Sequence, residues 1–168
     1  MQIQYHFDMN WRMVFLLAVL APAVKMDAAN DAPLERATLR GLQALNVVVD
    51  TLDPELTREN LTQDAFQSRM ERRLQTAGIR VDKEAREFLG LRITHVRARR
   101  GPVAVCLSIG LYQPVTLSRD QAIKSVTQTW EVVSVVMAAR RVLNEASMSS
   151  VDELTDRFVA AYQSVNPK

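Results

Sequence analysis

Two side chains in this sequence could together perform nucleophilic chemistry: the single thiol, Cys106, and the imidazole of His95. A thiol next to an imidazole is the starting arrangement of a cysteine hydrolase. The two residues fall on the two arms of a predicted β-hairpin, residues 91–98 and 103–116. They lie directly opposite each other only if the turn between the arms consists of two residues.

A register that slips by one residue places the thiol and the imidazole on opposite faces of the sheet. Burial favours this slipped register, because it aligns Leu91 and Ile93 with the alternating apolar residues from 105 to 111. No third group is evident that would orient the imidazole. We therefore expect Cys106 to be a packed core thiol and His95 an ordinary histidine, and the protein to lack catalytic activity. A cysteine hydrolase using these two residues is the alternative.

Three carboxylates, Asp50, Asp53 and Glu55, cluster at the end of a predicted buried strand, residues 45–52. A carboxylate trio in a loop could bind Ca²⁺, but the twelve-residue calcium-loop pattern and its glycine are missing. We interpret the trio as a polar turn. Residues 24–168 contain one cysteine and one histidine. This excludes metal sites built from several such ligands. The sequence has no glycine-rich phosphate loop, serine elbow or zinc signature, and we expect no metal and no cofactor.

A candidate binding surface combines the small-residue face of the long predicted strand with the basic tip of the hairpin. A helix packed over that strand face would make it part of the core, whereas an open face could dock a strand or a glycan. The formal net charge of +2 is too small to indicate nucleic-acid binding. The residues of this surface are Ser108, Tyr112, Arg97, Arg99 and Arg100.

The stretch from Met13 to Ala23 is apolar, follows Arg12 and ends in a small-x-small triplet, which is typical of a secretory signal peptide. It is shorter than the roughly 20 residues of a transmembrane helix. No cysteine follows it directly, so we expect neither a stable membrane anchor nor lipidation. The translation start stays open between Met1, Met9 and Met13.

The domain organisation follows from this leader. We expect a signal peptide over residues 1–23, a flexible leader over 24–38 and a single domain over 39–168. About 145 residues remain after the signal peptide, which suffices for one domain with a proper core. With a single cysteine, that core has no internal disulfide and depends on packing.

Strand and helix patterns alternate along the domain. Thr62 and Gly78 have the residue types of an N-cap and a C-terminal stop for a helix. A strand is expected at 123–136, and Ser150 and Glu153 form a capping box for a last helix. Residues 137–149 fit either a helix or a loop.

This order predicts an α+β fold with one mostly antiparallel sheet of about four to five strands. Two main helices pack on one face of that sheet. A helix joins the first two strands, so that pair could be parallel.

Four segments stand out along the chain: 39–42, 113–119, 127–130 and 158–167. Together they resemble a family of exported bacterial proteins of unknown function. The resemblance covers most of the chain after the signal peptide and implies no activity or catalytic residues. The element order is also similar to that of the amino-terminal domain of TolB and related envelope-assembly modules.

The sequence thus predicts an exported protein, periplasmic or extracellular, that serves as a non-catalytic binding or assembly module of the bacterial envelope. Its partner would be an envelope protein or a glycan, not nucleic acid. A carrier of small ligands is a third class, which would need an apolar cavity between the helices and the sheet.

The signal peptide makes a direct prediction about the mature chain. Cleavage after Ala23 or Ala28 gives a protein that begins at Val24 or Ala29 and is soluble outside the cytoplasm. Intact-mass measurement on the exported protein checks this. A chain that retains residues 13–23 and sediments with membranes would contradict it.

Overall fold

The computed structural model describes residues 24–96 and 101–167. The predicted signal peptide and the hairpin-tip residues Arg97, Arg99 and Arg100 lie outside these ranges. The strands are β1 (Val24–Asn30), β2 (Asn46–Val49), β3 (Phe88–Val96), β4 (Val103–Leu117) and β5 (Asp120–Ala138). The helices are α1 (Pro33–Ala37), α2 (Pro54–Arg58), α3 (Gln63–Thr76) and α4 (Arg140–Val165).

The strands form one mixed sheet in the order β1-β5-β4-β3-β2. The pairs β1–β5, β5–β4 and β4–β3 are antiparallel, whereas the pair β3–β2 is parallel. The α+β class is confirmed, but the expected mostly antiparallel sheet is corrected to a mixed one. The reason is that the chain crosses from β2 through α2 and α3 before it returns as β3. Beside this sheet, a single parallel bridge joins Leu45 to Val81.

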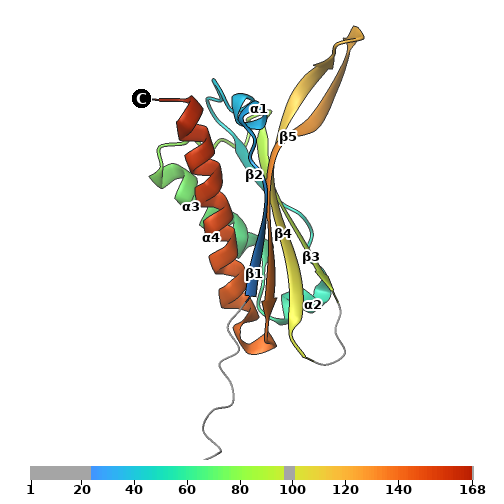
Figure 1. Ribbon diagram of the computed structural model, residues 1–168, viewed down its shortest axis with the longest axis vertical. Coiled ribbons are helices and arrows are strands. Elements are labelled where there is room, and N and C mark those ends of the chain that lie inside the picture. The colour runs from blue at the N-terminus through green and yellow to red at the C-terminus, as the bar shows by residue number, and fades with distance from the viewer. Residues whose placement is uncertain (1–23, 97–100, 168) are drawn as a thin grey trace, which may run out of the picture.

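The core lies between the sheet and the two long helices, and β4 is its central strand. Alternate side chains of β4 from Val103 to Leu111 are 0–3% exposed. Helices α3 and α4 lie side by side on this face of the sheet (Figure 1). Leu91 pairs with Ile109 and Ile93 with Leu107, which confirms the slipped hairpin register.

Residues 24–38 are not a flexible leader, because they contain β1 and α1. The indole nitrogen of the buried Trp130 donates a hydrogen bond to Asp31 at 3.1 Å. Arg36 binds both oxygens of the same carboxylate, at 2.7 and 2.5 Å. The Arg36 hydrogen bond, helped by Trp130, lowers the pKa of Asp31 against the opposing effect of burial. This segment therefore belongs to the packed structure.

Helix α3 begins and ends where the sequence predicts. The hydroxyl of Thr62 accepts a hydrogen bond from the backbone N–H of Ala65 at 3.2 Å, as an N-cap does. Leu61 and Phe66, on either side of the cap, are both fully buried. Gly78 follows the helix at φ 81°, in the left-handed region that favours glycine.

Helix α4 begins eleven residues earlier than predicted, with its N-cap at Ala139 and not at Ser150. It starts at Arg140, directly after β5, so most of the ambiguous segment 137–149 is helical. Ser150 lies inside the helix and is fully buried, and its hydroxyl has no hydrogen-bond partner among the described residues. The capping-box pattern at Ser150 was misleading because a local pattern of residue types cannot show that the helix has already begun. The carboxylate trio that we interpreted as a polar turn likewise extends into a short helix, α2, whose N-cap is Asp53.

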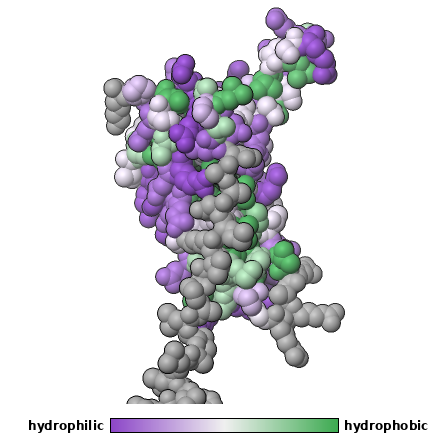
Figure 2. Space-filling view, viewed as in Figure 1, coloured by the Kyte–Doolittle hydropathy of each residue, from purple (hydrophilic) through white to green (hydrophobic). Residues whose placement is uncertain are grey.

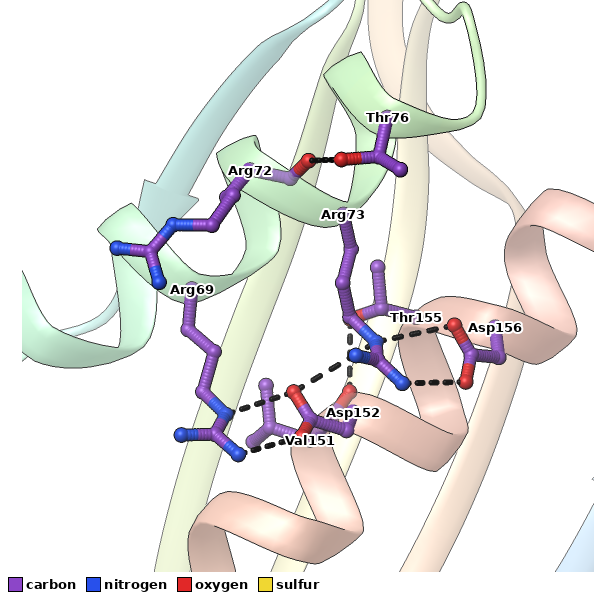
Figure 3. A network of polar contacts seen from close by, with 8 residues as sticks. All are labelled: Arg69, Arg72, Arg73, Thr76, Val151, Asp152, Thr155 and Asp156. Atoms are coloured by element: carbon purple, nitrogen blue, oxygen red, sulfur yellow. Dashed lines mark hydrogen bonds and ion pairs between the residues drawn. The ribbon is translucent and has the colours of Figure 1, made fainter.

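Charged pairs join α3 to α4 along their outer edge (Figure 3). Arg69 binds Asp152 through two hydrogen bonds of 2.7 and 2.6 Å, and Arg73 binds Asp156 at 3.0 and 2.6 Å. A weaker contact of 3.6 Å joins Arg73 to Asp152 and links the two pairs. Isolated surface pairs contribute little, but bidentate pairs in a network fix the relative orientation of the helices.

Strands β4 and β5 continue beyond their neighbours as a two-stranded arm. β3 begins at Phe88, opposite Tyr112, and β1 ends at Asn30, opposite Glu131. Within the described residues, 113–127 therefore have no flanking strand on either side of the β4–β5 pair. A register irregularity between Leu111 and Tyr112 marks the start of the arm. The arm projects clear of the body and has a largely hydrophilic tip (Figures 1 and 2).

Two substitutions compare how much the N-cap of α3 and the core contribute to the free energy of unfolding. Thr62→Ala should cost about 1 kcal/mol, the usual loss for an N-cap. Phe158→Ala should cost about 3 to 5 kcal/mol, because Phe158 is fully buried and packs edge-on against Trp130 at 5.2 Å. Urea unfolding curves compare the two. Equal losses would mean that α4 does not depend on this packing.

Candidate functional site

The second face of the sheet, which we call the uncovered face, lies on the side away from α3 and α4. Most of its side chains are half-buried, and Val96 and Met137 are 69% and 46% exposed. The pairing of the strands places the following residues on it: Val48, Phe88, Gly90, Arg92, Thr94, Val96, Ala104, Cys106, Ser108, Gly110, Tyr112, Glu131, Val133, Val135 and Met137. Among the described residues, no helix packs over the small-residue face of the long strand.

The centre of the uncovered face is polar. Arg92 and Ser108 are cross-strand partners. Arg92 donates a hydrogen bond to Asp50 at 3.1 Å, and the hydroxyl of Ser108 donates one to Glu131. The hydrogen bond to Asp50, with smaller contributions from Tyr112 and Glu131, raises the pKa of Arg92, which stays charged. Donors and acceptors are thus concentrated around one cross-strand pair.

An aromatic pair borders this polar centre. The rings of Phe88 and Tyr112 stack with centroids 4.8 Å apart and planes 6° from parallel. Next to them Gly90 pairs with Gly110. A Cβ at Gly90 would lie 3.0 Å from the Tyr112 ring, so the absent side chain allows the ring to lie flat on the strand. A hollow of about 170 Å³ opens here, lined in part by Asp50, Phe88, Arg92, Ser108 and Tyr112.

The thiol and the imidazole do not meet. Cys106 pairs with Thr94 and lies half-buried on the uncovered face. His95 pairs with Val105, a fully buried residue of the core face. The structure therefore does not assemble the nucleophilic pair. Cys106 is only half-buried and no helix among the described residues packs over it, so it is not the core thiol that we expected.

His95 instead joins two carboxylates of the predicted trio. Its Nε2 lies 3.2 Å from Oε2 of Glu55, and its side chain is 7% exposed. One ligand atom each from Asp53, Glu55 and His95 lies within 4.8 Å of the others. Asp50, the third member of the trio, turns to the other face and pairs with Arg92. We call Asp53, Glu55 and His95 the imidazole–carboxylate cluster. Among the described residues, it is the group best suited to hold a metal ion.

Sequence reasoning found part of the uncovered face and missed the rest. Ser108 and Tyr112 lie on it as predicted. Arg92, Phe88 and Glu131 were missed, although the slipped register pairs Arg92 with Ser108 and Phe88 with Tyr112. That register was therefore the signal that could have identified two of them. The basic hairpin tip lies outside the described residues.

A larger hollow lies elsewhere, between residues 40–44, residues 80–87 and Gln113. It measures about 450 Å³, is open to solvent and is lined mainly by polar side chains, including Arg40, Arg80 and Glu87. It is therefore not the apolar cavity that a carrier of small ligands would need.

No known protein family matches this sequence, and no curated protein matches it. Among solved structures, the chain is similar to the PelC dodecamer protein from Paraburkholderia phytofirmans, with 15% identity and a TM-score of 0.42 over 84% of this chain and 98% of PelC. It is also similar to a minor lipoprotein from Acinetobacter baumannii, with 8% identity and a TM-score of 0.38 over 74% of this chain and 93% of that protein. Similarity at this level assigns no function. Within the described residues, no helix has both the length and the apolar character needed to cross a membrane.

The separation of Cys106 from His95 predicts how the thiol reacts. Activation by His95 requires contact between the two side chains, so His95→Ala should leave the rate of iodoacetamide labelling of native Cys106 unchanged between pH 6 and 9. The labelling rate of the two proteins, followed by mass spectrometry, checks this. Fast labelling near pH 6 that disappears in His95→Ala would contradict the observed register.

Proposed function

We propose that this protein is an exported, non-catalytic binding module of the bacterial envelope and that the uncovered face is its binding surface. One observation carries the proposal: the solvent side of β4 is not uniformly polar. The outer face of an antiparallel sheet normally presents polar residues to water. Here the outward positions include Ala104, Cys106, Gly110 and Tyr112. This composition suits contact with a partner better than it suits permanent hydration.

The chemistry of the face favours a glycan over a protein partner. The Tyr112 ring offers a flat apolar surface with a polar hydroxyl at its edge. Arg92, Ser108 and Glu131 offer donors and acceptors next to it. This combination matches a sugar, which has an apolar ring face and hydroxyl groups around its edge. A protein partner would usually need a larger apolar patch at the centre of the contact.

The shape of the face suits a polymer. The hollow beside Tyr112 is shallow and small, at about 170 Å³, so it would hold only a short part of a ligand. β4 continues from Tyr112 directly into the projecting arm (Figure 1). The arm lengthens the surface in one direction, which gives an extended chain more to contact than a single small molecule would need.

No observation favours the cysteine hydrolase. The pairing of β3 and β4 puts Cys106 and His95 on opposite faces. A nucleophile and its base must lie within hydrogen-bond reach, and a register shift of the whole hairpin would be required to bring them together. Such a shift would expose the buried apolar side chains of β4.

Binding to purified envelope glycans tests the proposed function. The mature protein is sedimented with peptidoglycan sacculi and, separately, captured with lipopolysaccharide. We expect binding to at least one of them, and Arg92→Ala and Tyr112→Leu should each weaken it by about tenfold or more, as central contacts do. Leucine at 112 keeps an apolar cover over Gly90 while it removes the flat ring.

Arg72→Ala is the matched control, because Arg72 is an exposed arginine on α3, away from the uncovered face. It should bind like the unmodified protein, and circular dichroism should show that all variants are folded. Absence of binding to both glycans, or equal binding by Arg92→Ala and Arg72→Ala, would overturn the proposal. A protein crosslinked to a photoreactive residue at position 108 in cells would point to a protein partner instead.

A further inference from the structure

A row of polar side chains, which we call the polar row, crosses the uncovered face next to the aromatic pair. It consists of Asp50 directly after β2, Arg92 on β3, Ser108 on β4 and Glu131 on β5. The Nε of Arg92 donates to Asp50 at 3.1 Å, and the hydroxyl of Ser108 donates to Glu131. The row thus holds one guanidinium between two carboxylates, so the charge that a ligand carries decides how well it fits here.

The positive charge of the polar row already has its counter-charges. Arg92 is hydrogen-bonded to Asp50, and Glu131 contributes to the raised pKa of the guanidinium. In the described body of the sheet, Arg92 is the only cation on the uncovered face. An anionic group that approaches Arg92 must therefore compete with Asp50 and is repelled by Glu131.

A cationic ligand fits the polar row no better. The carboxylate of Asp50 already contacts Arg92, and the guanidinium repels a second cation from the space between the two carboxylates. The side chains of Arg92 and Asp50 are 62% and 52% exposed, so solvent and salt screen their charges. What these groups offer a ligand is their hydrogen-bonding capacity more than their electric field.

The polar row has hydrogen-bonding groups of both kinds to spare. A guanidinium carries five N–H donors, and its Nε donor is the one that binds Asp50. A carboxylate accepts more than one hydrogen bond. The hydroxyl groups of a sugar both donate and accept, so they match this mixture. The hollow of about 170 Å³ is lined by Arg92, Gly90 and Tyr112, which brings one ligand ring within reach of the polar row and of the aromatic pair.

We propose, as an extension of the function proposed above, that the uncovered face binds an uncharged stretch of a glycan chain. The hydroxyl groups of this stretch bind the polar row, and one face of a sugar ring lies against Tyr112. Polymers that bind proteins through phosphate or carboxylate groups are then not its ligands, because Arg92 is compensated by Asp50 and Glu131.

Salt dependence tests the charge of the ligand, in the same assays with sacculi and lipopolysaccharide. Raising NaCl from 50 to 500 mM shortens the screening length from about 14 Å to about 4 Å. Where the bound stretch is uncharged, the affinity should change by less than about twofold between these concentrations. A ligand held by its phosphates or carboxylates should lose about tenfold or more, because salt screens that attraction.

Two substitutions separate charge from hydrogen bonding. Arg92→Lys keeps the positive charge but loses the planar fork of donors, so an uncharged stretch should bind about tenfold more weakly, whereas an anionic ligand would stay within about threefold. Glu131→Gln removes a negative charge while its amide oxygen can still accept from Ser108. It should leave the affinity for an uncharged stretch within about threefold, whereas an anionic ligand would bind several-fold more tightly.

Asp64→Asn is the matched control for Glu131→Gln, because Asp64 is an exposed carboxylate in the first turn of α3 and the charge change is the same. It should bind like the unmodified protein. Urea midpoints of all variants should show that they are folded.

The two proposals fail in different ways. Absence of binding to both glycan preparations would remove the binding function itself. Binding that falls about tenfold in 500 mM NaCl, or that survives in Arg92→Lys and strengthens in Glu131→Gln, would overturn the uncharged ligand and leave a module for an anionic glycan. Binding that resists salt and is weakened in Arg92→Lys supports the uncharged ligand.

Discussion

The burial of alternate apolar side chains of β4 against α3 and α4 is the constraint on which the rest of this structure depends. A strand presents successive side chains to opposite faces, so committing Val103, Val105, Leu107, Ile109 and Leu111 to the core commits their neighbours to the other side. The two flanking strands must then align their own apolar residues with that stripe. A one-residue slip would expose the whole set, which is why the register is unambiguous.

The same constraint divides the polar side chains between the two faces of the sheet. The strand register places Arg92, Ser108 and Glu131 together on the uncovered face, whereas it places His95 on the covered side. The cysteine and the histidine are thereby kept apart, although they are close in the hairpin. The carboxylates after β2 are divided in the same way, since Asp50 contacts Arg92 and Glu55 contacts His95. Burial of the apolar stripe thus decides which groups can act together.

Two of the four segments behind the sequence resemblance, residues 39–42 and 158–167, meet in the structure. The Tyr162 hydroxyl donates to the Leu42 carbonyl at 3.0 Å, and the Asn166 amide donates to the Leu39 carbonyl at 2.9 Å. The backbone N–H of Gly41 donates to Asn166 at 2.8 Å. These contacts fasten the end of α4 to the loop before β2. The side chains of Tyr162 and Asn166 therefore stabilise the packing of this chain.

The sequence by itself determined the features that depend on neighbours along the chain. The period-two pattern of β4, the Thr62 cap and the Gly78 stop are local, and the apolar matching of the hairpin also indicated its register. The sequence could not show that 24–38 is ordered, because that order depends on pairing with β5 and on the contact between Asp31 and the distant Trp130. It could not place His95 beside Glu55, which requires α2 to fold against the covered face. Only the tertiary structure decided these arrangements, because each joins groups whose separation in sequence carries no periodic signal.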